Sequence, residues 1–249
     1  MNLGLVDWGV GGLSVYQRLI SKKLNITYLS DSGAMPYGKM AKPQLIQRLQ
    51  LVCDFFRTKN IQHIVIACNA ASTVLNEVKR KNPDLVFYGM LDSGAELVRK
   101  SKVENSLIIG GKRTVLSKYF QTRFKNSRIK TQVKIAQPLS AFIEKGDMSS
   151  ILFQRSLKKV FSNLKFKPDS VLLACTHYPA IEKQIKQLVP TAKILDPSTM
   201  IIKKISRKKE INFLKKTDQF YTTGLPSSMV KSAQKAFGLN IRKLTKISL

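Results

Sequence analysis

Two cysteines follow short apolar runs in matching contexts, Cys68 in the segment HIVIACNAAS and Cys175 in the segment SVLLACTHYP. Runs of β-branched and aliphatic residues of this kind are typical of buried parallel strands, whose carboxyl ends form the ligand-binding edge of an α/β sheet. Each strand is therefore expected to deliver a thiol to that edge. Two such thiols predict a site with two reactive sides.

A thiol held near a base can act as a nucleophile, a redox centre or an acid-base catalyst. Cysteine proteases and acyl transferases use one cysteine with one histidine, so a second equivalent cysteine would be idle. Redox pairs usually lie two residues apart. Two equivalent thiols on opposite sides of a cleft favour another reaction, in which one thiolate removes a proton from a carbon and the other thiol returns a proton to the opposite face. That reaction inverts a stereocentre.

Each thiol needs a helper, because a free cysteine is mostly protonated near neutral pH. His177 stands two residues after Cys175, so in an extended segment both side chains project to the same side. Asp7 ends the first predicted strand and lies at the same sheet edge as Cys68, where it could orient or deprotonate that thiol. The alternatives are a structural or substrate-binding histidine and a turn-capping carboxylate. His63 begins a strand without an evident partner and is interpreted as structural.

Small polar residues surround the two thiols. Asn69, Ser72 and Thr176, together with the backbone N–H groups of the helix starts, form an expected anion-binding rim suited to a carboxylate. An amino acid that carries a carboxylate is therefore the expected small anionic substrate.

The third cysteine, Cys53, lies on the apolar face of the segment LIQRLQLVCDFF and is interpreted as a core residue. Three cysteines without a CxxC pair favour neither a disulfide framework nor a structural zinc site, so no metal site is expected. The thiols are expected to be reduced.

The net charge of +28 comes from 43 Lys and Arg residues against 15 Asp and Glu residues. Such a field attracts nucleic acids, anionic membranes or small anions, but solvated lysine faces are the preferred interpretation. The chain lacks zinc-finger spacing, an RNP-like aromatic motif and a Gly-x-x-Gly clamp, so only nonspecific attraction to nucleic acid is expected. Without a long apolar stretch or a secretory signal pattern, the sequence predicts a cytoplasmic protein with no membrane partner.

Predicted strands alternate with predicted helices, as in a doubly wound α/β fold. The expected strands of the first half cover residues 3–9, 25–31, 63–68 and 85–91. The expected helices cover residues 12–23, 43–58, about 70–84 and 92–102, the last with Asp92 or Ser93 as its N-cap.

The second half repeats this pattern, because SLIIGGKRTVLSKYFQTRF echoes the opening LGLVDWGVGGLSVYQRL. The 61 residues between Asp7 and Cys68 are close to the 65 residues between Gly110 and Cys175. Two copies of this length favour two pseudo-symmetric doubly wound lobes with parallel sheets and a ligand site in the cleft between them.

The stretch after about Ile205 contains a strand, a turn and a helix, and is too short for a third domain. It is expected to pack back onto the first lobe, which would bury Phe220, Val230, Ala233 and Phe237. The first lobe is then predicted to comprise residues 1–95 and 205–249, and the second lobe residues 96–204.

Five ordered motifs resemble those of glutamate racemases, in the aspartate/glutamate racemase superfamily. VDWGVGGLSV stands where that family has DSGVGG, ACNAAS where it has CNTAS, and ACTHYP where it has GCTHYP. The PYG segment at residues 36–38 and PLSAFIEKG, which contains Glu144 and Gly146, also match. The resemblance extends from the first strand to about Ser198.

This resemblance implies a cofactor-independent racemase with a two-lobed fold, which often forms homodimers and supplies D-glutamate for peptidoglycan. It implies that Cys68 and Cys175 are the acid-base catalysts, supported in the first lobe by Asp7 and in the second by Glu144 and His177. The substrate-binding residues that it implies are Trp8, Pro36, Tyr37, Gly38, Asn69, Ala70 and Thr176.

Two positions depart from the family pattern. Trp8 replaces a serine and Ala70 replaces a threonine, so two substrate-contacting hydroxyls are lost. Loss of such hydrogen bonds can change specificity by orders of magnitude. A Trp8 ring in the cleft would shrink the pocket, and a ring in the lobe core would only make the pocket less polar. Glutamate is the expected substrate; the alternatives are another amino acid, or a non-enzymatic relative that binds DNA or another polyanion.

Overall fold

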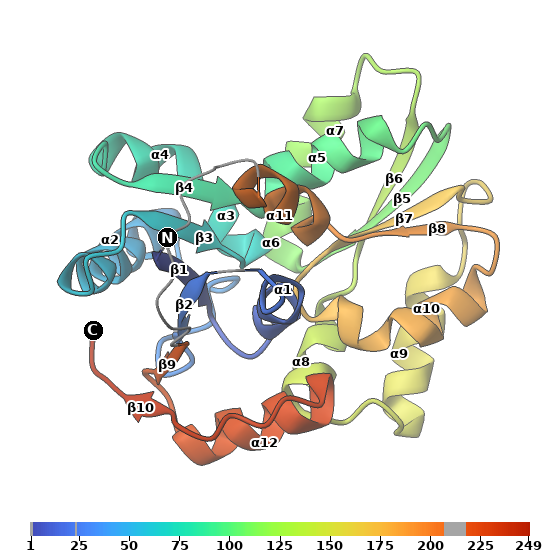
Figure 1. Cartoon of the computed structure of the whole chain (residues 1–249). Coiled ribbons are helices and arrows are strands. Elements are labelled where there is room, and N and C mark those ends of the chain that lie inside the picture. Colours follow the sequence, from blue (N-terminus) through green and yellow to red (C-terminus); the bar gives the residue numbers. More distant parts are fainter. Residues whose placement is uncertain (1, 23, 207–217) are drawn as a thin grey trace.

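Two parallel β-sheets form the framework of the protein (Figure 1). The computed structural model describes residues 2–22, 24–206 and 218–249. One sheet has the strand order β10-β9-β2-β1-β3-β4 and the other has the order β6-β5-β7-β8. Every paired strand of these sheets runs parallel to its neighbour. The predicted α/β fold with two lobes is confirmed.

The first sheet is built around β1, whose residues are buried from Leu3 onward. An apolar strand of this kind is typical of a parallel sheet with helices on both faces. Its strands are β1 (Asn2–Asp7), β2 (Asn25–Ser30), β3 (His63–Ile66), β4 (Val86–Gly89), β9 (Gln219–Thr222) and β10 (Thr245–Lys246). The helices of this part of the chain are α1 (Leu13–Leu19), α2 (Lys42–Thr58), α3 (Asn69–Ser72), α4 (Leu75–Lys81) and α12 (Pro226–Phe237).

The second sheet repeats the arrangement of the first. Its order β6-β5-β7-β8 matches β2-β1-β3-β4, with the first strand of each half in an inner position. The strands are β5 (Asn105–Gly110), β6 (Lys130–Ile135), β7 (Ser170–Ala174) and β8 (Lys193–Leu195). The accompanying helices are α6 (Lys112–Leu116), α7 (Tyr119–Phe124), α8 (Gln137–Lys145), α9 (Ile151–Phe161) and α10 (Glu182–Leu188). A short 3-10 turn covers Tyr178–Ile181.

Two further helices, α5 (Met90–Lys100) and α11 (Ser198–Ser206), pack against each other where the chain passes between the sheets. Leu91 and Val98 of α5 belong to the core of the second sheet, whereas Ile201 and Ile205 of α11 belong to the core of the first. The packed pair of helices therefore joins the two lobes.

The C-terminal segment returns to the first sheet. Strand β9 pairs with β2 from Thr27 opposite Gln219 to Ser30 opposite Thr222. Met229 and Ala233 of α12 are buried in the core that contains β1. The start of this segment, after about residue 205, falls partly outside the described residues.

Several element boundaries differ from the sequence-based expectation. The expected helix 12–23 ends at Leu19, and the expected helix 70–84 is two helices separated at Thr73 and Val74. Helix α5 begins at Met90 with Gly89 as its N-cap, so the prediction of Asp92 or Ser93 was wrong. The reason is that the Ser72 hydroxyl accepts the Met90 N–H at 3.1 Å, which satisfies the helix start earlier than expected.

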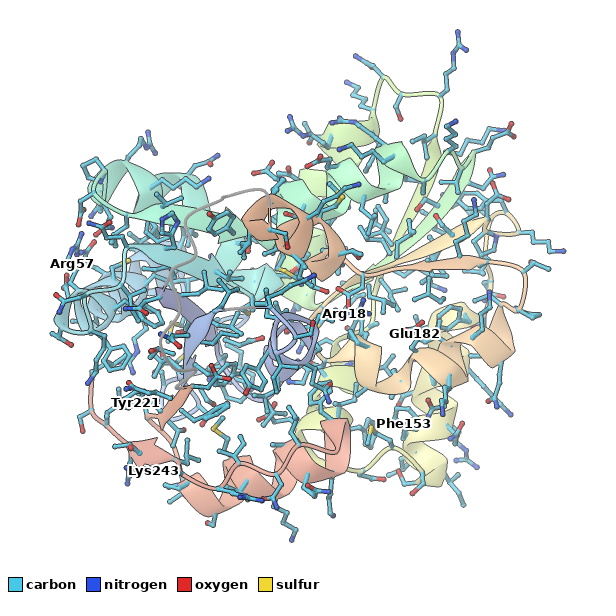
Figure 2. All side chains as sticks on the ribbon, in the orientation of Figure 1. Arg18, Arg57, Phe153, Glu182, Tyr221 and Lys243 are labelled. Atoms are coloured by element: carbon cyan, nitrogen blue, oxygen red, sulfur yellow. The ribbon has the colours of Figure 1, made fainter. Side chains whose placement is uncertain are left out.

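Apolar side chains make up most of the core, and Figure 2 draws the described side chains on the ribbon. Phe153 is fully buried in the second lobe, and Cys53 is fully buried in the first, as predicted. Lys243 lies at the periphery of the molecule. Among the described residues, no helix is long and apolar enough to cross a membrane.

Candidate active site

The two cysteines lie at equivalent sheet edges. Strand β3 ends at Ile66, two residues before Cys68, and β7 ends at Ala174, directly before Cys175. Both thiols are half-buried and interact electrostatically with each other. The structure thus brings together two thiols from the two lobes.

A hydrogen-bonded row supports Cys175. The Cys175 Sγ lies 3.6 Å from His177 Nδ1, and His177 Nε2 lies 2.6 Å from Glu144 Oε2. Burial opposes a charge on the ring, but the contacts with Cys175 and Glu144 outweigh it and raise the pKa of His177 well above its usual value. These contacts favour the protonated ring beside Cys175, and an imidazolium there would stabilise a thiolate.

Cys68 has the opposite environment. Burial, and then the nearby Asp7 charge, raise the pKa of Cys68 well above its usual value, although the backbone N–H groups of Ala70 and Ala71 oppose this. Asp7 is itself buried, and burial raises the pKa of its carboxyl. This environment favours the neutral thiol at Cys68, so the site has one side suited to a base and one side suited to an acid.

Each lobe donates hydrogen bonds to a carboxylate of the other lobe. Thr176 of the second lobe donates a 2.6 Å hydrogen bond to Asp7 Oδ2, and the Trp8 N–H donates a 2.7 Å bond to Asp7 Oδ1. In return, the Val10 N–H of the first lobe donates to both Glu144 carboxylate oxygens at 3.2 and 3.3 Å.

Glycines make this contact possible. A Cβ atom at Gly9 would lie 2.5 Å from Glu144 Oε2, and one at Gly11 would lie 2.6 Å from both His177 Nδ1 and Thr176 Oγ1. The glycine-rich turn after β1 therefore packs directly against Glu144, Thr176 and His177 of the second lobe.

Comparison with known proteins identifies the family. The family model for Asp/Glu/Hydantoin racemases matches residues 16–205. The chain belongs to this racemase family. A glutamate racemase of Hydrogenobaculum sp. (strain Y04AAS1) is 32% identical over 212 residues, which cover 83% of this chain and 82% of the relative. One of Carboxydothermus hydrogenoformans is 29% identical and aligns with 100% of this chain and 97% of its own.

Solved structures agree with this family assignment. The glutamate racemase of Campylobacter jejuni superposes with a TM-score of 0.86 at 26% identity, covering 98% of this chain and 100% of its own. The enzyme of Francisella tularensis, solved with D-glutamate, shares the fold with a TM-score of 0.89 at 23% identity over 99% of this chain and 97% of its own. The resemblance predicted from the motifs is confirmed.

Asn69 is the clearest candidate for substrate contact in this member of the racemase family. It is the first residue of α3, directly after Cys68, and is 3% exposed. Within the part of the chain that the structure describes, neither its amide oxygen nor its amide nitrogen has a hydrogen-bond partner. Buried polar groups are almost always satisfied, so this amide is available to a ligand.

Trp8 lies against the core of the first lobe. Its indole Nε1 donates a 2.8 Å hydrogen bond to the Ala34 carbonyl, and its ring packs against the core cluster of the first lobe, as does Ala70. Of the two orientations considered from the sequence, the structure has the ring packed against the core. Trp8 therefore ties the loop between β2 and α2 to the sheet.

The PYG segment lies in this same loop. Tyr37 is buried and donates a 2.7 Å hydrogen bond to Asp31, which is also bound by Arg48. Pro36 and Gly38 are half-buried, and a Cβ atom at Gly38 would lie 3.9 Å from Gln137 of the second lobe. The loop thus reaches the facing lobe.

Ser72 does not belong to the predicted anion-binding rim. Its hydroxyl donates to the Cys68 carbonyl at 3.0 Å and accepts from the Met90 N–H. Because both bonds are internal to the fold, the side chain supports the turn after Cys68 and is not free for a ligand. That expectation was wrong.

Arg113 was missed by sequence reasoning. From α6 of the second lobe it donates to Thr73 Oγ1 at 2.9 Å and to the Met40 carbonyl at 2.6 Å, and it interacts electrostatically with Cys68. It is one of 43 basic residues and lies in none of the matched motifs, so no signal in the sequence singled it out.

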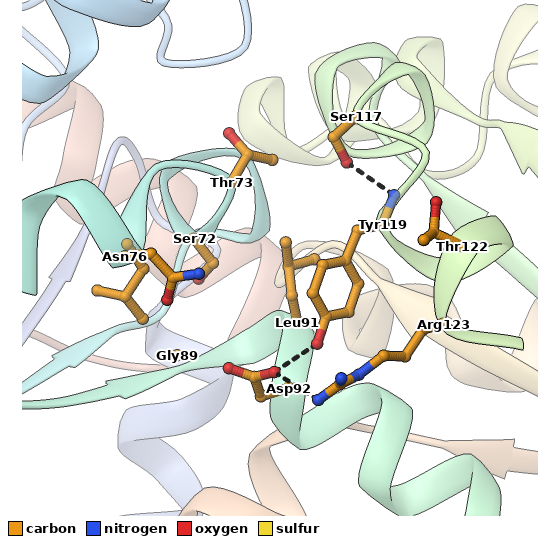
Figure 3. Close-up of a pocket in the computed structure, with 11 residues that line it drawn as sticks. Ser72, Thr73, Asn76, Gly89, Leu91, Asp92, Ser117, Tyr119, Thr122 and Arg123 are labelled. Atoms are coloured by element: carbon orange, nitrogen blue, oxygen red, sulfur yellow. Dashed lines mark hydrogen bonds and ion pairs between the residues drawn. The ribbon is translucent and has the colours of Figure 1, made fainter.

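A cavity of about 380 Å³ lies between the lobes, with Thr73 in its wall (Figure 3). Its lining comes from α3, α4 and the end of β4 in the first lobe, from α5 and α7, and from Ser117 directly after α6. Tyr119 and Arg123 both contact Asp92 across it. For the described ranges, no group of three or more His, Cys, Asp or Glu side chains has an arrangement that could hold a metal ion.

Proposed function

We propose that this chain interconverts L- and D-glutamate by proton exchange at Cα between two thiols, without an organic cofactor, and so supplies D-glutamate for peptidoglycan. The observation that carries the proposal is the pair of half-buried thiols from two lobes, with a cation beside one and a carboxylate near the other. The names of the relatives and the D-glutamate held by the Francisella tularensis enzyme support glutamate as the substrate.

In one direction, the Cys175 thiolate takes the proton from Cα of the bound amino acid, and His177 stays protonated beside it. The carbanion then takes a proton from the Cys68 thiol on the opposite face, which leaves Cys68 as the thiolate and inverts the centre. The other enantiomer runs the same steps in reverse. Between turnovers, His177 and Asp7 are placed to exchange the thiol protons with solvent.

We assign supporting roles to the remaining candidates. Glu144 holds His177, and Thr176 holds Asp7. Asn69 binds the α-carbon end of the substrate beside Cys68, which is supported by its unpaired buried amide. Trp8, Pro36, Tyr37, Gly38 and Ala70 form the wall of the pocket on the first lobe.

The two-thiol mechanism is tested by replacing each cysteine in turn with alanine. Racemisation of glutamate, followed by circular dichroism, is expected to fall by about 1,000-fold or more in C68A and in C175A, because each loses one proton-transfer group. The buried Cys53 is the matched control, and C53A is expected to retain turnover. Turnover close to that of the wild type in either active-site variant would refute the mechanism.

Substrate choice is tested by incubating the wild-type protein in D2O with a panel of L- and D-amino acids and following loss of the α-proton by NMR. Exchange with both glutamate enantiomers is expected. Exchange confined to another amino acid would assign a different substrate, and exchange with none would reject a racemase.

We also propose the division into a first lobe of residues 1–95 and 205–249 and a second lobe of residues 96–204, with both boundaries inside the connecting helices α5 and α11. We further propose a homodimer as the assembly. The pairing of β9 with β2 supports the assignment of the C-terminal segment to the first lobe. Ile151 and Leu152, at the start of α9, are 72% and 65% exposed and are apolar surface that a second copy could cover. Sedimentation of the protein and of the I151S/L152S variant tests the assembly, because a wild-type monomer would exclude it.

A further inference from the structure

Three arginines of the described chain are half-buried, and they differ in their partners. Arg48 pairs with Asp31, and Arg57 pairs with Asp54 and Asp84. Among the residues that the structure describes, Arg113 has no carboxylate partner. Partial removal of a cation from water without a counter-charge is unfavourable, so Arg113 is suited to binding an anion.

The bonds that hold Arg113 leave part of its guanidinium unused. Its Nε donates to Thr73 Oγ1 and its Nη1 to the Met40 carbonyl, and both acceptors are neutral. A guanidinium has five N–H donors, so donors remain on Nη1 and Nη2. Burial also lowers the pKa of Arg113, as expected for a cation whose charge is not compensated.

The position of Arg113 relates it to the thiols. It interacts electrostatically with Cys68 and is anchored at Thr73, five residues further along the chain. Thr73 directly follows α3 and Cys68 directly precedes it, so the Nε of Arg113 is held at the opposite end of this short helix from Cys68. Asn69, directly after Cys68, is the residue that we assign to the α-carbon end of the substrate. Arg113 is therefore placed for the far end of an extended substrate.

We propose that Arg113 binds the side-chain carboxylate of the substrate and thereby restricts this site to dicarboxylic amino acids. The inference rests on the proposed racemase function and specifies how the substrate is selected. A carboxylate that enters between the lobes supplies the missing counter-charge. It also accepts hydrogen bonds from the unused N–H groups, in the bidentate geometry that arginine favours.

The test compares glutamate with glutamine, whose side chain has the same shape without the charge. In R113Q the KM for glutamate is expected to rise by about 100-fold, the effect of removing one partner of a desolvated charge pair, while α-proton exchange of glutamine changes by about 3-fold or less. R113K keeps the charge but loses the planar guanidinium that can donate two parallel hydrogen bonds. Its KM for glutamate is therefore expected to lie between those of the wild type and R113Q. The exposed Arg128 is the control, because R128Q changes net charge equally and is expected to leave KM unchanged.

The outcomes separate the inference from the function on which it rests. A KM for glutamate within about 3-fold of the wild-type value in R113Q would overturn the inference, whatever glutamine does. A lower kcat with an unchanged KM would also overturn it and would make Arg113 a residue that only positions the lobes. A wild-type protein that exchanges the α-proton of no amino acid would reject the racemase itself, and with it the role of Arg113.

Discussion

At Cys175 and Cys68, two chemically identical side chains differ through their neighbours. The His177 imidazolium gives Cys175 the counter-charge of a thiolate, whereas burial and the Asp7 charge raise the pKa of Cys68. Acid-base catalysis with a single carbon needs this division, because one group must accept a proton while the other has one to give. In the proposed mechanism, these surroundings make Cys175 the base and Cys68 the acid in one direction.

The pH dependence of turnover should reveal the contribution of Glu144. Its carboxylate helps to raise the pKa of His177, so E144Q is expected to lower that pKa. The imidazolium then loses its proton at lower pH. The alkaline limb of the kcat/KM profile should therefore shift to lower pH by about one unit. Profiles of the wild type and E144Q measure this.

A carboxylate outside the site provides the control for this prediction. Glu104 is exposed, and E104Q should keep the alkaline limb of the wild type. An unchanged limb in E144Q would mean that another group sets the profile.

Residue-scale prediction from the sequence succeeded where the signal was local. A cysteine directly after an apolar run fixes the thiol at a sheet edge, and His177 is only two residues from Cys175. The bond from Thr176 to Asp7 joins residues 169 positions apart, and Arg113 meets Thr73 across 40 positions. No propensity or spacing encodes such contacts, because they depend on how the lobes face each other.

At the scale of elements, the glycine-rich turn after β1 has the strictest requirement. A Cβ atom at Gly9 would meet the Glu144 carboxylate, and one at Gly11 would meet His177 and Thr176, so a side chain at either position would displace these groups. The turn therefore sets the spacing of the lobes as well as the start of α1. Alternation of strands and helices was readable from the sequence, whereas the start of α5 was not, because the Ser72 side chain caps it from a distant segment.

Substitution of Gly11 tests this requirement. In G11A the new methyl group must displace His177 and Thr176, and kcat is expected to fall by about 100-fold because the acid-base groups are misplaced. Circular dichroism and thermal unfolding of the same sample would establish that the fold is kept.

Gly238 offers the matched control. It has a positive φ of 65° at the end of α12, and a Cβ atom added there would meet nothing within 4 Å. G238A should therefore lower the free energy of unfolding by about 1 kcal/mol through backbone strain alone. Its kcat should stay at the wild-type value. Equal losses of activity in G11A and G238A would contradict the special role of the turn.

At the scale of the whole molecule, the net charge of +28 dominates long-range behaviour. Nonspecific attraction to nucleic acid is expected, because each neutralised phosphate releases counterions and the affinity then falls steeply with salt. Duplex DNA of any sequence should bind at about 50 mM salt and dissociate by about 300 mM. Fluorescence anisotropy with two unrelated duplexes measures this, and salt-resistant or sequence-selective binding would indicate a dedicated nucleic-acid site.

The hydrogen bonds that each lobe donates to the other also constrain how the sequence can evolve. Asp7 depends on Thr176 and Glu144 depends on Val10, so neither half of the repeat carries a working half-site. Although the two lobes share one strand order, their sequences cannot diverge independently. A substitution in the turn after β1 would change the positions of Glu144, Thr176 and His177 in the other lobe. Variants of the two segments should therefore be inherited as matched pairs, and a chimera that joins lobes from distant relatives should fold and yet turn over slowly.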